Sequence, residues 1–175
     1  MNVIKDVYFY YGKLVRPGLK FGSQTEREYS IDVLISKEDA ATFANTFAKQ
    51  KPKKLDRDEF VEKFKVDPPY DSALYHVIKL KKPAQKRDGS PLPEIYTPKA
   101  YVNVDGRLQV MDKEFHNGAK GAVEIETFQN DYGSFARLKN IRLDSFEEYV
   151  REDATATALG EVETADVPFA TEEEY

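Results

Sequence analysis

The chain has 175 residues and a net charge of −5, and 33% of its residues are charged. It contains no cysteine and two histidines, which argues against a disulfide framework, a thiolate or histidine-rich metal site and a cysteine nucleophile. No apolar run approaches the roughly 20 residues that span a bilayer, and the N-terminus lacks the pattern of a signal peptide. We therefore expect a soluble intracellular protein with no membrane partner.

The first half of the chain predicts two strands followed by two helices. Residues 7–18 are rich in aromatic and β-branched side chains and end at a Pro-Gly turn, and residues 27–35 alternate between apolar and polar. Ser36 is a typical helix N-cap, and an apolar stripe follows it over about three turns. A shorter helix is predicted over 55–65, with Phe60 and Phe64 on one face. These helices form an insertion at about 37–65.

The second half predicts strands joined mostly by tight turns. They cover residues 74–82, 100–104, 107–111, 122–128 and 134–143, and a proline-rich loop follows the first of them. Asp105-Gly106 and Asp131-Tyr-Gly133 are turns typical of hairpins. Such a chain must curl its sheet to bury one face. We therefore predict a mainly β fold, a small antiparallel β-barrel with the two helices at one end or against one side.

The charge is unevenly distributed along the chain. Residues 152–175 contain acids but no lysine or arginine, which leaves a net charge of +3 on residues 1–151. We interpret 1–151 as the folded domain and 152–175 as a disordered acidic tail. Such a tail competes with nucleic acid for a basic surface, recruits other proteins, or only keeps the chain soluble, and composition does not decide among these.

Motifs for catalysis are missing from the sequence. It has no phosphate-binding loop, no nucleophile elbow and no histidine pair at metal-ligand spacing. Glu124 and Glu126 share a strand face, so a hydrolase that uses paired carboxylates is one alternative. Acids in this arrangement more often meet solvent or lysine. We expect a protein that is not an enzyme, with no cofactor and no metal.

Aromatic and cationic side chains alternate onto the same strand faces. Tyr75 shares a face with Lys79 and Lys81, and Phe135 shares one with Arg137 and Lys139. Exposed rings beside cations suit single-stranded nucleic acid, because bases stack on the rings and the cations contact phosphates. The predicted stacking residues are Tyr75 and Phe135, followed by Tyr10 and Tyr101, and the predicted phosphate contacts are Lys79, Lys81, Lys86, Arg107, Arg137 and Lys139.

Several segments resemble the single-stranded DNA-binding proteins of tailed bacteriophages. These are YGKLVRP (11–17), EYSIDVLISKED (28–39), AYVNVDG (100–106), GAKGAVEI (118–125) and FARLKNIRL (135–143), with the terminal EEEY. The resemblance implies an OB-fold barrel that coats single-stranded DNA without reading its sequence. It places the protein in phage replication and recombination, in the cytoplasm of the infected bacterium. It also implies a homo-oligomer or a cooperative filament on DNA.

The same resemblance gives the tail two roles. It contacts replication proteins of the phage or host, and it competes with DNA for the groove. The implied tail residues are Asp166, Phe169, Glu172, Glu173, Glu174 and Tyr175. Two other interpretations of the sequence stay open. One is a protein-interaction adaptor, and the other is an OB-fold protein that binds RNA, since stacked aromatics serve RNA equally well.

Overall fold

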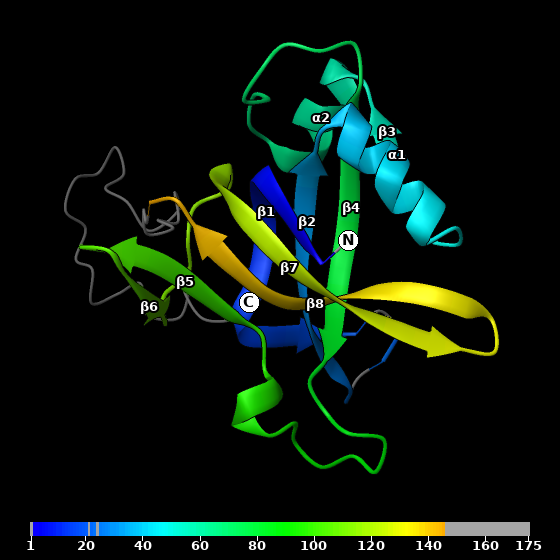
Figure 1. Ribbon diagram of the computed structural model, residues 1–175, viewed down its shortest axis with the longest axis vertical. Coiled ribbons are helices and arrows are strands. Elements are labelled where there is room, and N and C mark those ends of the chain that lie inside the picture. The colour runs from blue at the N-terminus through cyan, green and yellow to red at the C-terminus, as the bar shows by residue number, and fades with distance from the viewer. Residues whose placement is uncertain (1, 21, 24, 146–175) are drawn as a thin grey trace, which may run out of the picture.

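The first strand, β1 (Val3–Leu19), is 17 residues long and lies in the middle of the sheet (Figure 1). The structure is a computed structural model that describes residues 2–20, 22–23 and 25–145. The described part contains one sheet in the order β3-β4-β2-β1-β7-β8-β5-β6. The other strands are β2 (Arg27–Ile35), β3 (Lys53–Leu55), β4 (Tyr75–Pro83), β5 (Lys99–Val104), β6 (Arg107–Met111), β7 (Ala119–Asn130) and β8 (Gly133–Leu143).

The fold is mainly β, as the sequence predicts. Among the described residues, six of the seven strand pairs are antiparallel, and the remaining one, between β5 and β8, is parallel. The sequence analysis predicted antiparallel pairing from the hairpin turns. It missed this parallel pair because β6 and β7 separate β5 from β8 along the chain, so no hairpin turn joins the two strands. The three-residue β3, inside the predicted helical insertion, was also not expected.

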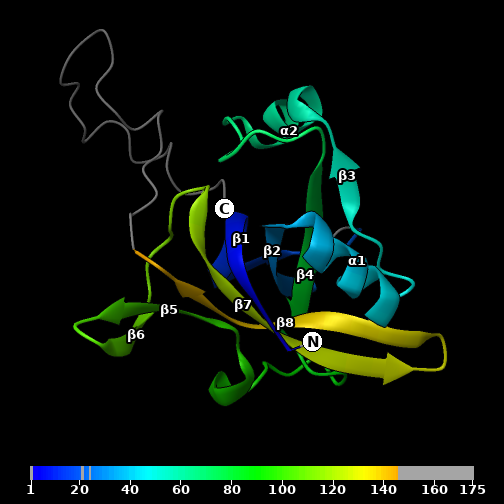
Figure 2. The same cartoon turned by 45° about the horizontal axis from the view of Figure 1, so that its top comes forward.

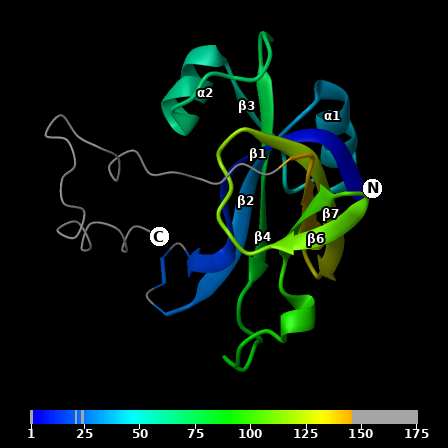
Figure 3. The same ribbon diagram turned by 90° about the vertical axis from the view of Figure 1, so that its left-hand side faces the viewer.

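The sheet curls around its main core. Ile78 and Leu80 of β4 pack in the same apolar cluster as Leu138 and Ile141 of β8, although β4 and β8 are four places apart in the sheet order. Figure 3 shows the sheet from the left-hand side of Figure 1, the side on which β5 and β6 lie. Alternate residues of β1, β2 and β4 therefore point into the curl, and the residues between them form an outer face.

Both predicted helices are present. In α1 (Lys37–Thr46) the hydroxyl of Ser36 accepts a hydrogen bond from the backbone N–H of Asp39 at 3.0 Å. In α2 (Arg57–Phe64), Asp56 and Glu59 form a reciprocal capping box. The two helices and β3 lie together at one end of the sheet (Figures 1 and 2). A short 3-10 helix (Glu94–Tyr96) follows the proline-rich loop.

α2 covers part of the outer face and creates a second apolar cluster. Its Phe60 and Phe64 rings lie 5.4 and 4.5 Å from the ring of Tyr10, measured between ring centres. Phe60 also lies 5.2 Å from Tyr75. Leu34 and Val77 complete the cluster from β2 and β4. The apolar stripe of α2 thus packs against the aromatic residues of β1 and β4.

β1 leaves its regular pairing with β2 beyond Tyr10. Tyr10 pairs with Asp32, Lys13 pairs with Ser30 and Gly18 pairs with Glu28, so β1 contains more residues than β2 over the same stretch. Extra residues in one strand of a pair bend that strand away from its neighbour. β1 consequently bends outward over residues 11–18, next to the end of α2.

The predicted tail, 152–175, lies outside the described residues, and so does the predicted boundary at 151. Both stay predictions. No helix in the described ranges is long and apolar enough to cross a membrane.

Candidate nucleic-acid interface

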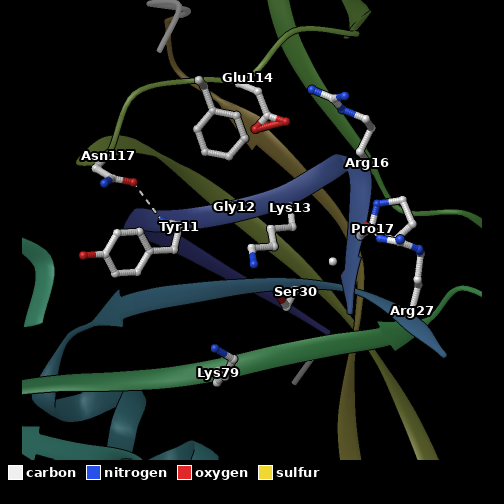
Figure 4. A pocket seen from close by; sticks show the side chains of 12 residues that line it. Tyr11, Gly12, Lys13, Arg16, Pro17, Arg27, Ser30, Lys79, Glu114 and Asn117 are labelled. Atoms are coloured by element: carbon white, nitrogen blue, oxygen red, sulfur yellow. Dashed lines mark hydrogen bonds between the residues drawn. The ribbon is translucent and has the colours of Figure 1, made fainter. Parts of the chain in front are cut away.

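A hollow of about 720 Å³ lies where β1 bends away from β2 (Figure 4). We call it the basic groove. Its floor includes Ser30 of β2 and Lys79 of β4, both on the outer face. The bend of β1 and the loop before β7 form its walls. The lining residues with charged or aromatic side chains are Tyr11, Lys13, Arg16, Arg27, Lys79, Glu114 and Phe115.

Tyr11 closes the groove at the end nearest α2. Its φ is 52°, a left-handed backbone conformation, and its N–H donates to Asn117 Oδ1 at 2.8 Å. The phenol oxygen donates to the carbonyl oxygen of Lys63 at 2.6 Å, and the ring lies 5.5 Å from Phe64. The residue remains 40% exposed. Tyr11 therefore presents a positioned, partly exposed ring to the groove.

Phe115 supplies a second ring. A Cβ atom built on Gly12 would lie 2.6 Å from the ring atom Cζ of Phe115, closer than real side chains approach. The ring packs directly against the backbone of β1 at this point, and a side chain at residue 12 would force it to shift. Phe115 also meets Phe9 of the core, edge-on, with ring centres 6.3 Å apart. The half-buried ring therefore lies between the core and the groove.

Four cations line the groove, and two of them form no ion pair within the described ranges. Lys79 pairs with the buried Asp32 at 3.6 Å across the β2–β4 pair. Neither Lys13 nor Arg27 forms an ion pair with a described residue, although one guanidinium nitrogen of Arg27 donates to the carbonyl oxygen of Pro17 at 3.4 Å. Arg16 lies on the outer part of the bend (Figure 4). The groove therefore has a net positive lining.

Glu114 is the acid in this lining. Burial raises the pKa of its carboxyl above the ordinary value for glutamate, while Arg16 and Lys13 act in the opposite direction. The carboxyl therefore lies near two cations but is poorly solvated. An anion that binds to these cations competes with the ionised form of Glu114.

A second hollow, of about 820 Å³, adjoins the first and shares Arg27 with it. Lys82, Lys86 and Arg137 are among its cations, but much of its charge is paired internally. Lys82 forms an ion pair with Glu126, and the Arg137 guanidinium stacks on Phe128 at 3.8 Å from the ring centre. Three acids line this hollow, Glu26, Glu28 and Asp88, with a single aromatic ring, Phe128. The basic groove has one acid and two rings in its lining, so its composition suits a stacked, negatively charged strand better.

The sequence-predicted residues are scattered rather than gathered. Lys79 lines the basic groove, and Lys86 and Arg137 line the second hollow. Lys81 and Lys139 are exposed but pair with Glu28 and Glu124, each at 3.6 Å. The others lie elsewhere: Phe135 on β8, Tyr101 on β5 and Arg107 on β6. DNA contact by these residues stays a prediction.

The prediction that Tyr75 and Tyr10 are exposed stacking platforms is wrong. Each residue is 1% exposed, because α2 covers them. Burial also raises the pKa of the Tyr10 hydroxyl. The alternation pattern placed Tyr75 opposite the apolar face of its strand but left open which face of the first strand is core. It did not show that a helix packs over both residues. The apolar Phe60 and Phe64 of the predicted helix were the signal, since that stripe needs an apolar partner.

Sequence reasoning also missed most of the groove. It did not select Tyr11, Lys13, Arg16, Arg27, Glu114 or Phe115 as site residues. The bend that brings the first three together depends on the register shifts of β1, which alternation cannot reveal. Three of these residues fall in the YGKLVRP segment that carries the family resemblance.

Comparison with solved structures identifies the fold. The single-stranded DNA-binding protein gp2.5 encoded by bacteriophage T7 aligns with a TM-score of 0.50 and 13% identity, over 89% of this chain and 97% of that chain. The chain has the fold of a phage single-stranded DNA-binding protein. At this identity the likeness shows the fold alone and transfers no individual residue.

Further matches are to the single-stranded DNA-binding protein from bacteriophage Enc34. Its C-terminally truncated form aligns with a TM-score of 0.47 and 16% identity, over 84% of this chain and 87% of that chain. Its complex with single-stranded DNA aligns with a TM-score of 0.46 and 16% identity, over 85% and 88%. No protein-family model matches the sequence, and a search of curated proteins found no match.

Proposed function

We propose that this protein is a non-enzymatic phage single-stranded DNA-binding protein and that the basic groove holds the strand. The observation that carries the proposal is the joint lining of the groove by rings and cations, on a fold that also occurs in the single-stranded DNA-binding protein of phage T7. Tyr11 and Phe115 are the stacking surfaces. Lys13, Arg16, Arg27 and Lys79 contact phosphates.

The chemistry of the groove favours a single strand over a duplex. A stacked base contributes about 1–3 kcal/mol, and it must be unpaired to reach a ring set into a hollow. Base stacking tolerates every base, so the groove is expected to bind without sequence preference. Cations along the groove add a contribution that weakens with salt.

The proposal also includes a role in the phage life cycle that depends on this binding activity. The protein coats single strands during phage replication and recombination in the cytoplasm of the infected host. The acidic residues from 152 to 175 contact replication proteins and compete with DNA for the basic groove. The net charge of +3 on residues 1–151 and the acidic composition of the tail support this competition.

Competition binding tests the proposal against its rivals. The full chain is titrated with labelled oligo-dT, and unlabelled duplex DNA or oligo-U of equal length then competes. We expect unlabelled oligo-dT to compete well and duplex poorly. Oligo-U that competes better than oligo-dT would make the chain an RNA-binding protein. Failure of every nucleic acid, also after removal of 152–175, would favour the adaptor interpretation.

A further inference from the structure

In the part of the chain that the structure describes, the sheet ends in two edge strands that are protected very differently. β3 forms one edge and β6 forms the other, and the two lie at opposite ends of the molecule (Figures 1 and 2). β3 is three residues long and carries the exposed Lys53 and Lys54. A short strand with lysines is a common device against pairing with another chain. β3 is therefore a guarded edge.

β6 lacks this protection. It has five residues, contains no lysine or proline, and pairs with β5 along one side, while no described strand pairs with its other side. Leu108 and Val110 are 57% and 52% exposed and, two residues apart, share one face of the strand. Met111 lies on the opposite face and packs against the main core. An apolar face beside an open edge is typical of a strand that pairs with another.

We propose that β6 pairs antiparallel with β6 of a second copy of this chain, centred on Gln109. In this register the two exposed apolar residues of β6 face each other across the strand pair. Leu108 of one copy lies opposite Val110 of the other, twice, which makes a continuous apolar strip. Tyr101 of β5 pairs with Val110 and extends the strip within each copy.

The alternative pairings are less favourable. Two β3 edges would bring lysines against lysines, with like charges facing each other. β6 against β3 would leave a free β6 and a free β3 at the ends, so the assembly would not close. Pairing of β6 with β6 forms a closed dimer with a two-fold axis, and it covers the apolar β6 edge of each copy. The inference rests on the sheet topology and not on the proposed DNA binding.

Concentration dependence is the first test. One short strand pair is a small interface, so we expect a weak dimer, with a dissociation constant of the order of 10–100 µM. Sedimentation velocity of the full chain from about 5 to about 500 µM should show a monomer that becomes a dimer. Hydrogen exchange should show β6 amides that gain protection over the same range. A chain that stays monomeric throughout overturns the proposal.

Paired substitutions test the register. Leu108→Lys with Val110→Lys places lysines opposite lysines and should raise the dissociation constant at least about tenfold. Leu108→Lys with Val110→Glu places lysine opposite glutamate at both positions and should restore much of the association. Ile95→Lys, at an exposed apolar residue outside β6, is the matched control and should change nothing. Equal weakening by both double variants overturns the register, and a dimer that the double-lysine variant leaves intact overturns the interface. Protection of the β6 amides that does not depend on concentration also overturns it.

Discussion

Tyr11 donates its phenol hydrogen to the carbonyl oxygen of Lys63 at 2.6 Å, which joins the bend of β1 to the last turn of α2. This bond connects the two parts of the fold that define the site. α2 covers the aromatic part of the outer face, and the basic groove begins where α2 ends. The exposed ring therefore lies where the buried aromatic cluster ends.

Substitution of Tyr11 should separate its two roles. Tyr11→Phe keeps the ring but loses the bond to Lys63, so we expect a loss of about 0.5–1.5 kcal/mol in the free energy of unfolding and little change in DNA affinity. Tyr11→Leu also loses the stacking surface and should weaken oligo-dT binding by about 1–3 kcal/mol. Urea denaturation and fluorescence anisotropy measure the two effects. Tyr96→Leu, at an exposed ring outside the groove, is the control. Equal affinity of Tyr11→Leu and the unmodified protein would remove the ring from the site.

Tyr75 should behave as a core residue. Its hydroxyl donates to the carbonyl oxygen of Tyr70 at 2.7 Å and accepts from the backbone N–H of Ser72 at 3.1 Å. Tyr75→Phe leaves both groups without their partner, and we expect a cost of about 1–3 kcal/mol in stability. Because the ring does not reach the groove, the folded variant should bind oligo-dT with unchanged affinity. Weakened binding by a variant that is still fully folded would contradict the buried position.

Glu114 should make DNA binding depend on pH. Its pKa is raised, so the carboxyl takes up a proton as the pH falls toward the acidic range, at a higher pH than an ordinary glutamate. Protonation removes a negative charge near Lys13 and Arg16 and should tighten binding of phosphates. Glu114→Gln should tighten binding about two- to fivefold at neutral pH and flatten this part of the pH profile. Affinity measured across the acidic range for both proteins checks this. A glutamine variant with the same pH profile would exclude Glu114 as the cause.

Glu114 should also make the stability of the fold depend on pH. The folded state holds the Glu114 proton more tightly than the unfolded chain does, because burial disfavours the charged form. Ionised Glu114 therefore penalises the folded state above its raised pKa, and the penalty disappears as the pH falls below the ordinary glutamate value. Glu114→Gln should raise the free energy of unfolding at neutral pH and have less effect in acid, which urea denaturation at both pH values measures.

Local pattern predicted much of the fold. The alternation of residues 27–35 predicts β2 with its observed bounds, and the Ser36 cap marks the start of α1. Long-range packing was not predictable in the same way. Periodicity assigns Tyr75 to a face but does not say what covers that face. The groove needs a bend in β1 that arises from its register against β2, so Lys13 could not be recognised as a neighbour of Lys79.

The most direct test of the central claim is the salt dependence of oligo-dT binding by Lys13→Gln with Arg27→Gln. If both cations neutralise phosphates, the double variant should bind more weakly, and the slope of log K against log salt should become shallower by about 0.7 for each phosphate that is no longer neutralised. Lys5→Gln with Lys51→Gln changes the net charge equally at exposed residues outside the groove and should leave the slope nearly unchanged. Equal slopes for the two double variants would contradict the basic groove as the binding site for the strand.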